Sequence, residues 1–206
     1  MKKLISSIKE LKNSEIKSLI DKRLKEFSDL GKKSSSELFK ELCFCILTAN
    51  STADRCIAVQ KKIKNSVITL KEKDLAKTLK KHSCRFHTKR ASYISEARTC
   101  IKKLNRIVKK DSLSAREWLN DNIKGLGMKE SSHFLRNIGF TDLAIIDFHI
   151  IDILAKNKII NKPKTLNKNN YLEIEQKLKQ IAEKANLNLA ELDLYLWYME
   201  TGKVLK

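Results

Sequence analysis

A chain of 206 residues, of which 42% are hydrophobic, is long enough for one compact domain or for two small lobes that share a core. With five glycines and one proline, the composition suits long helices and argues against a sheet with many tight turns. Lysine and arginine number 43 against 24 acidic residues, which gives a net charge of +19. This charge favours a polyanion such as nucleic acid as the partner. The alternative is a lysine-rich chain whose charged helix faces are only solvated.

The five cysteines do not have the pattern of a disulfide framework or a zinc site, because they are odd in number and no pair has Cys-x-x-Cys spacing. Cys43, Cys45 and Cys56 lie in apolar helical segments, so we expect buried thiols there. No signal peptide and no apolar run of membrane-spanning length is recognisable. The sequence therefore predicts an intracellular, cytoplasmic protein without contact to a membrane.

The first half of the chain predicts a succession of amphipathic helices, because apolar residues recur at helical spacing. Ser14 is the expected N-cap of the first helix, and Gly31 its end. The apolar patch at residues 66–70 has no assignment from pattern alone, whereas residues 84–90 are expected to form a basic loop. The expected helices span residues 14–30, 38–47, 53–63, 74–80 and 88–108.

The second half is organised around a helix-hairpin-helix motif at about residues 114–137. Ser114 and Glu117 have the spacing of a capping box at the start of its first helix. The turn follows at residues 125–127, and Lys129 opens the second helix. Three more helices are expected after the hairpin, at residues 148–155, 168–185 and 189–201.

The hairpin turn has the residue types of a DNA-binding site. Gly125 and Gly127 let the backbone approach a phosphate, and the helix that begins there directs its free N–H groups and positive dipole end at the anion. Lys124 and Met128 flank the two glycines and are expected to contact DNA as well, while Leu126 packs back between the helices. Carbonyl groups of the turn are candidates for holding a monovalent cation. A glycine C-cap between two ordinary helices would explain the same spacing.

Lys129 and Asp147 are the candidate catalytic residues. A lysine near a helix N-terminus and other cations has its charged form disfavoured, so neutral amine becomes available as a nucleophile. Asp147 is expected at the head of a helix, where N–H groups keep a carboxylate ionised, and an ionised carboxylate stabilises a developing sugar cation. The alternatives are a solvated lysine and an aspartate that is only an N-cap.

On these residues the sequence resembles the helix-hairpin-helix DNA glycosylase superfamily. Within it, the chain is most similar to the second, archaeal-type family of 8-oxoguanine DNA glycosylases. The matching segments are residues 41–50, 85–91, 122–129, 132–137, 144–149 and 193–204.

The resemblance implies an all-α fold of two helical lobes with the active-site cleft between them. The lobe made by the terminal segments would comprise residues 1–47 and 140–206, and the central lobe residues 48–139, ending in the hairpin. It also implies a monomer without an iron–sulfur cluster or other cofactor.

The implied activity is that of a bifunctional base-excision-repair enzyme acting on double-stranded DNA that contains 8-oxoguanine. The damaged base would be flipped into a pocket, Lys129 would displace it through a Schiff base with help from Asp147, and β-elimination would nick the strand. Phe86, Trp197 and Lys206 would contribute to the base pocket. Core packing of the aromatic residues and a frayed tail at Lys206 are the alternatives.

The chain also departs from the family pattern. Phe148 stands where relatives carry a basic residue, and His87 and Thr88 replace residues that are more often aromatic and basic. No cysteine follows Cys100, which excludes the four-cysteine cluster of the endonuclease III relatives and favours oxoguanine over oxidised pyrimidines. A glycosylase for another damaged base and a non-catalytic helix-hairpin-helix DNA-binding protein are the alternatives to the leading function.

Overall fold

The computed structural model describes residues 1–206 and consists of helices without a strand, which confirms the predicted all-α class. None of these helices combines the length and the apolar character that crossing a bilayer requires. In chain order the elements are α1 (Lys2–Lys12), α2 (Ile16–Gly31), α3 (Ser35–Thr48), α4 (Ala53–Ile63), α5 (Ser66–Thr69), α6 (Glu72–Lys81), α7 (His87–Ala97), the 3-10 helix η1 (Arg98–Cys100), α8 (Ile101–Ile107), α9 (Ser112–Asn122), α10 (Met128–Asn137), α11 (Phe148–Lys156), α12 (Lys168–Ala185) and α13 (Leu189–Thr201).

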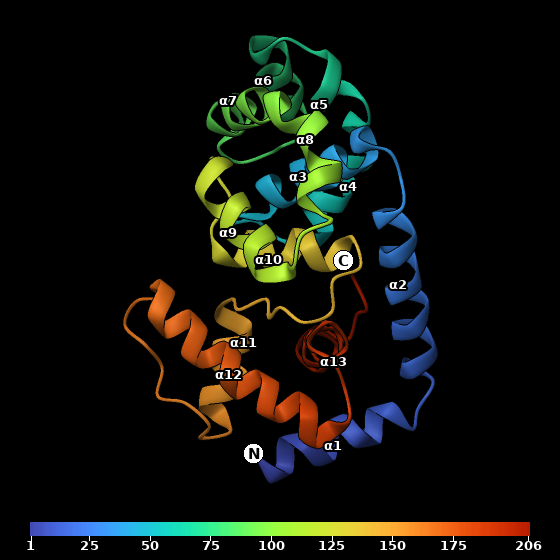
Figure 1. Ribbon diagram of the computed structural model, residues 1–206, viewed down its shortest axis with the longest axis vertical. Helices are drawn as coiled ribbons and strands as arrows, with labels where there is room; N and C mark the ends of the chain where they lie inside the picture. The colour runs from blue at the N-terminus through green and yellow to red at the C-terminus, as the bar shows by residue number, and fades with distance from the viewer.

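Buried apolar side chains form two separate clusters, and each cluster defines a lobe. The central lobe is built from α3 to α10 and buries residues between Leu38 and Leu143. The terminal lobe combines α1 and α2 with α11 to α13 and buries residues 4–27 and 144–196. In Figure 1 the two lobes lie one above the other, and α2 runs along their side. The predicted arrangement of two helical lobes is therefore confirmed.

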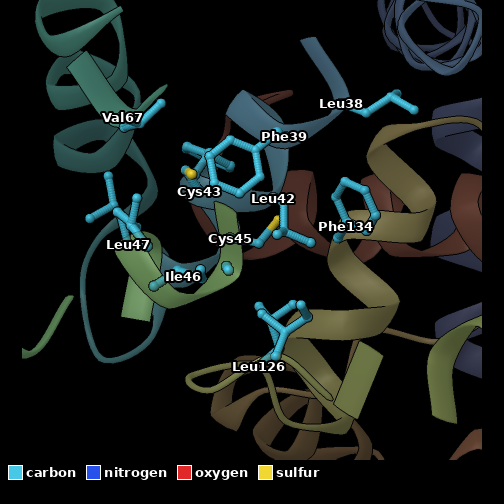
Figure 2. Packing of buried hydrophobic residues seen from close by; sticks show 14 of the residues in the cluster. Leu38, Phe39, Leu42, Cys43, Cys45, Ile46, Leu47, Val67, Leu126 and Phe134 are labelled. Atoms are coloured by element: carbon cyan, nitrogen blue, oxygen red, sulfur yellow. The ribbon is translucent and has the colours of Figure 1, made fainter. Parts of the chain in front are cut away.

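Helix α3 lies in the central lobe, whereas residues 1–47 were expected to belong together in the terminal lobe. Its residues from Leu38 to Leu47 are buried on every face of the helix, so α3 needs neighbours all around it. Figure 2 shows these side chains between Val67 and the hairpin residues Leu126 and Phe134. The division therefore falls in the connection after α2, because an apolar helix of this kind is most stable at the centre of a core.

Three local expectations are corrected by the tertiary contacts. Helix α2 begins at Ile16 rather than at Ser14, whose hydroxyl donates to the Leu11 carbonyl (2.8 Å) in the turn after α1. The single helix expected over residues 88–108 is broken at η1, where the Arg98 side chain donates to the Val67 carbonyl (2.8 Å).

The first helix of the hairpin also starts earlier than the capping box predicted. Asp111 is the N-cap of α9, and its side chain accepts a hydrogen bond from the Ser114 backbone N–H (2.9 Å). Ser112 donates to Asp142, which ties the start of α9 to the loop after α10. An aspartate three residues before Ser114 is at least as good a cap as the serine, so the start of the helix moves to it.

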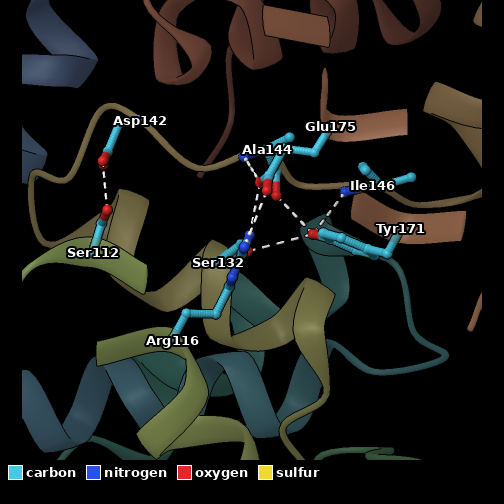
Figure 3. Close-up of polar contacts among 8 residues, drawn as sticks. All are labelled: Ser112, Arg116, Ser132, Asp142, Ala144, Ile146, Tyr171 and Glu175. Carbon is cyan, nitrogen blue, oxygen red and sulfur yellow. Dashed lines mark hydrogen bonds and ion pairs between the residues drawn. The ribbon is translucent and has the colours of Figure 1, made fainter. Parts of the chain in front are cut away.

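A buried ion pair joins the hairpin to the terminal lobe. Arg116 of α9 makes two hydrogen bonds, of 2.7 and 3.0 Å, to the carboxylate of Glu175 on α12, and both side chains are 2% exposed. Figure 3 shows the two side chains facing each other. One oxygen of Glu175 also accepts from the Ala144 backbone N–H (2.9 Å). Because the pair is bidentate and fully desolvated, it fixes the position of one lobe against the other.

Tyr171 extends this contact to the segment that leads into α11. Its hydroxyl donates to the Ala144 carbonyl (2.6 Å) and accepts from the Ile146 backbone N–H (3.3 Å), with Ser132 of α10 at 3.4 Å. Burial raises the pKa of the Tyr171 hydroxyl, so it stays protonated as a donor. The backbone just before Asp147 is thus held between α10 and α12 (Figure 3).

Removal of one partner of the buried pair is expected to destabilise the protein strongly. Glu175→Leu leaves the Arg116 guanidinium buried without its carboxylate, which costs about 3–5 kcal/mol in other proteins. The free energy of unfolding, measured by urea denaturation, should fall by this amount. The double variant Arg116→Met/Glu175→Leu should lose less than the single variant, since no charge then stays unpaired.

The exposed pair Lys17–Asp21, with side chains 52% and 50% exposed, provides the control. Asp21→Asn should change the free energy of unfolding by less than about 1 kcal/mol. A Glu175→Leu variant no less stable than Asp21→Asn would contradict the role given to the buried pair.

Candidate active site

A cavity of about 690 Å³ lies where the two lobes meet, as expected for a cleft between them. The central lobe contributes the end of α3, the start of α4 and one face of α10 to its lining. The terminal lobe contributes residues 145–150, α13 and residues 203–206. Both candidate catalytic residues, Lys129 and Asp147, line this cavity, so the structure brings together two residues that are eighteen positions apart in the sequence.

Lys129 is the second residue of α10, directly after the hairpin turn. Its side chain is 23% exposed, and its Nζ lies 3.7 Å from a carboxylate oxygen of Glu130. The alternative of an ordinary solvated lysine does not describe this environment, because the amine faces the cavity rather than open solvent. A half-buried amine at a helix N-terminus is suitably placed for a nucleophile.

Asp147 is both an N-cap and a cavity residue. Its Oδ1 accepts a hydrogen bond from the Ile150 backbone N–H (3.0 Å) at the start of α11, as predicted. The cap uses one carboxylate oxygen, so the second remains available to a bound group. A carboxylate in this position can stabilise a positive charge that develops in the cavity.

Asp193 and Arg136 form an ion pair in the cavity lining that the sequence did not reveal. Asp193 comes from α13, and its Oδ2 lies 3.4 Å from the Arg136 guanidinium of α10. Burial raises the pKa of Asp193 to about 6, with a further contribution from Asp147, while Arg136 and Lys129 oppose the rise. The carboxyl group of Asp193 therefore titrates closer to neutral pH than an ordinary aspartate does, and it lies beside the two candidate catalytic residues.

His133, one turn after Lys129 on α10, is a second residue that sequence reasoning missed. It is buried in the cavity lining, and neither ring nitrogen has a hydrogen-bond partner. Burial lowers the pKa of His133 well below 6.5, and the cations Arg136, Lys129 and Lys206 lower it further. His133 is therefore a neutral hydrogen-bonding group. Its spacing of four residues from Lys129 was the available signal in the sequence.

Of the three residues expected in the base pocket, the structure brings two to the cavity. Trp197 of α13 and Lys206 line it, so the alternatives of plain core packing and a frayed tail do not apply to them. Phe86 does not line the cavity. It is 55% exposed, and the guanidinium groups of its neighbours Arg85 and Arg90 lie 5.2 and 5.9 Å from its ring centre. Arg85 is the residue of this loop that reaches the cavity.

An aromatic cluster forms the outer wall of the cavity on the side of the terminal lobe. Phe148 is 65% exposed, and its ring centre lies 3.9 Å from that of His149. His149 in turn meets Trp197 edge-on at 5.3 Å, and its Nδ1 lies 3.8 Å from Glu200. An exposed apolar ring therefore stands at position 148, where a basic residue was expected in relatives.

The two hairpin glycines occupy positions that require glycine to different extents. Gly125 has a φ of +88°, and a Cβ there would lie 2.6 Å from the ring of Tyr93, so only glycine fits. Gly127 has a φ of −95°, which other residues adopt, and its N–H donates to Glu130 (3.3 Å) as the N-cap of α10. Leu126 between them is buried in the central cluster, as predicted.

The residues that flank the glycines differ in accessibility. Lys124 is 67% exposed and pairs with Glu96 at 2.8 Å, and the hydrogen bond that Lys124 donates to Glu96 raises the pKa of Lys124. An exposed pair of this kind contributes little to stability, so the ammonium group of Lys124 stays available to an anion. Met128 instead packs against the apolar cluster of the terminal lobe, so its side chain connects the hairpin to that lobe.

The raised pKa of Asp193 implies a specific dependence of stability on pH. The pKa of Asp193 is about 6 in the folded state, whereas the ordinary value for an aspartate is 3.8. The group therefore contributes to the free energy of unfolding below pH 4, and this contribution is lost as the pH rises through 6. Asp193→Asn should therefore remove a decline of about 1–3 kcal/mol in the free energy of unfolding between pH 4 and 7. Urea denaturation at a series of pH values measures this difference.

For His133 we expect the free energy of unfolding to change with pH in the opposite direction. Its lowered pKa contributes stability that is present above pH 6.5 and is lost as the pH falls. His133→Gln should therefore flatten a rise in the free energy of unfolding with pH, where Asp193→Asn flattens a decline. Slopes that change in the same direction in both variants would contradict the assigned charge states.

Comparison with known proteins identifies the family. A family model described as 8-oxoguanine DNA glycosylase matches residues 20–187. The 8-oxoguanine DNA glycosylase/AP lyase of Methanocaldococcus jannaschii is 54% identical over 206 residues, which cover 98% of this chain and 99% of that protein. The crystal structure of the M. jannaschii glycosylase/lyase in complex with a 15mer DNA containing 8-oxoguanine is 52% identical with a TM-score of 0.96, and covers 98% of this chain and 99% of that one. That of the Thermotoga maritima 8-oxoguanine DNA glycosylase is 40% identical with a TM-score of 0.95, and covers 100% and 99%. This chain belongs to the 8-oxoguanine DNA glycosylase family.

Proposed function

We propose that this protein removes 8-oxoguanine from DNA and then cleaves the strand at the resulting abasic site. The observation that carries the proposal is the position of Lys129 and Asp147, which line one cavity between the lobes of a chain built like the 8-oxoguanine DNA glycosylase/AP lyases. The relative solved with DNA containing 8-oxoguanine supports the choice of lesion.

The reaction follows from the chemistry of a nucleophilic amine and a fixed carboxylate. The damaged nucleotide is flipped out of the duplex into the cavity. The Lys129 amine forms a bond to C1′ while the bond from C1′ to the base breaks, and the base leaves with that electron pair and takes up a proton. Asp147 stabilises the positive charge that develops on the sugar. The amine loses one proton, and its lone pair forms a double bond to C1′ while the bond from C1′ to the ring oxygen breaks. The ring oxygen keeps that electron pair and takes up a proton, and the opened sugar is left as a protonated Schiff base.

The second step uses the same covalent intermediate. The Schiff base acidifies the proton on C2′, and loss of this proton leaves its electron pair to form a double bond between C2′ and C3′. The bond between C3′ and its phosphate oxygen breaks, so the strand is cut on the 3′ side of the lesion. Hydrolysis of the Schiff base then releases Lys129.

Other parts of the site bind the base and the DNA. Trp197 supplies an aromatic surface and Lys206 a charged group to the base pocket, whereas Phe86 stays outside it. The turn at Gly125 and the start of α10 present backbone N–H groups to a phosphate. We further propose that the enzyme acts as a monomer on double-stranded DNA inside the cell, and that hairpin carbonyls hold a monovalent cation.

Substitution of the nucleophile tests the proposal directly. Borohydride should trap a covalent complex between the protein and a duplex that contains 8-oxoguanine, and Lys129→Gln should abolish this complex, since an amide forms no Schiff base. Lys124→Gln, which changes the exposed lysine of the same hairpin, should keep the trapped complex. Trapping that persists in Lys129→Gln would assign the nucleophile to another lysine.

A panel of duplexes with different damaged bases, assayed in the same way, decides the substrate. Release of another base in preference to 8-oxoguanine would make the protein a glycosylase for that lesion. Binding without base release would leave a non-catalytic DNA-binding protein, with an affinity that falls steeply with salt concentration.

Asp147→Asn separates catalysis from folding, because asparagine caps a helix as well as aspartate does. The variant should keep the start of α11 and lose the negative charge beside the sugar. We expect single-turnover excision to slow by about 100-fold or more, with little change in affinity for an uncleavable duplex. An equal loss of affinity and rate would show that Asp147 acts in binding instead.

A further inference from the structure

Glu41 is a buried carboxylate that the reaction described above does not use. It lies on α3, is 3% exposed and accepts hydrogen bonds from three different parts of the chain. The donors are Asn137 at the end of α10 (2.7 Å), Gln60 of α4 (3.2 Å) and the Nζ of Lys206 (2.7 Å). A buried carboxylate costs free energy unless it is paired, so the position of Glu41 depends on these partners.

The ammonium group of Lys206 is held by this contact and by an aromatic ring. Its Nζ lies 2.7 Å from Glu41 and 4.4 Å from the ring centre of Phe44, one turn further along α3. Residues 203–206 follow the end of α13 and belong to no helix. The other side-chain ion pair in this segment joins Lys203 to Asp54, and both of those side chains are more than half exposed. An exposed ion pair of this kind contributes little to holding the segment in place.

We propose that Glu41 is a positioning residue that fixes Lys206 in the base pocket and thereby sets how well the enzyme selects the oxidised base. This inference rests on the proposed function and adds to it a buried residue of the central lobe. Asn137 and Gln60 hold the carboxylate, the carboxylate holds the ammonium, and the side chain of Lys206 is ordered before DNA binds. An ordered side chain loses less conformational entropy on binding than a free one, so the pocket is prepared for the base.

The two activities of the enzyme depend on Glu41 to different extents. Excision of 8-oxoguanine requires that the base be recognised in the pocket. Strand cleavage at a preformed abasic site requires Lys129 and Asp147, but there is no base to recognise. Displacement of Lys206 should therefore slow base excision and leave the reaction at an abasic site unchanged, whereas a general loss of structure would lower both.

Glu41→Gln provides the test, since it keeps the shape of the side chain and removes the charge that holds Lys206. We expect single-turnover excision of 8-oxoguanine to fall by about ten-fold or more, as for the loss of a hydrogen bond to a charged group. Borohydride trapping on a duplex with a preformed abasic site should stay within about two-fold of the unsubstituted protein. Glu37→Gln on the same helix is the matched control, because the Glu37 side chain is 45% exposed, pairs with Lys40 and does not line the cavity; both activities should be unchanged.

A double-variant cycle shows whether Glu41 acts through Lys206. If it does, Glu41→Gln should add little to the loss of excision in a Lys206→Ala background. Losses that multiply in the double variant would overturn the proposal. An equal fall in excision and in abasic-site trapping by folded Glu41→Gln would overturn it as well.

Should Glu41→Gln fail to fold, Gln60→Ala removes a partly exposed donor to the same carboxylate, and excision should again fall more than trapping. If the unsubstituted protein traps at abasic sites but excises no 8-oxoguanine, the proposed function itself fails, and this result is distinct from every outcome for Glu41.

Discussion

The bidentate pair between Arg116 and Glu175 is the interaction on which the geometry of the site depends. Both charges are buried, so neither side chain can leave the other without a large desolvation cost. The pair joins the first helix of the hairpin to the terminal lobe, and Glu175 also fixes the backbone at Ala144, three residues before Asp147. Lys129 lies at the start of α10, directly after the turn that joins it to α9, the helix that carries Arg116. One ion pair thus sets the relative position of an amine and a carboxylate that belong to different lobes.

Helix α10 contributes four polar or charged side chains to the cavity, while another of its faces lies in the core. Lys129, His133 and Asn137 are spaced four residues apart and share a face, whereas Phe134 is buried in the central cluster. Two cations of the cavity lining are paired with largely buried carboxylates, Arg136 with Asp193 and Lys206 with Glu41. The lining as a whole holds more cations than carboxylates, because Arg55, Arg85 and Lys203 line the cavity as well. Together with the net charge of +19, this favours the approach of DNA.

Sequence patterns predicted the elements whose start and end signals are local. The bounds of α12 and α13 are confirmed, because Asn167 and Asn188 are strong N-caps that precede clear helical periodicity. The break between α7 and α8 was not predictable, since it depends on a hydrogen bond from Arg98 to a carbonyl 31 residues away. Periodicity also gave no reason to place α3 in one lobe rather than the other, because a helix buried on all faces fits either core.

The sequence by itself determined the helical class, the hairpin turn and the choice of Lys129 and Asp147 as candidates, since each depends on residue types at short spacing. Only the tertiary structure decided that these two residues line one cavity, that Phe86 lies outside it and that Asp193 and His133 lie within it. Only the fold, likewise, brings Lys206 to Glu41, across 165 positions of sequence. The physical reason is that periodicity and capping report on neighbours within a few turns of helix, whereas burial and charge pairing depend on which helices meet.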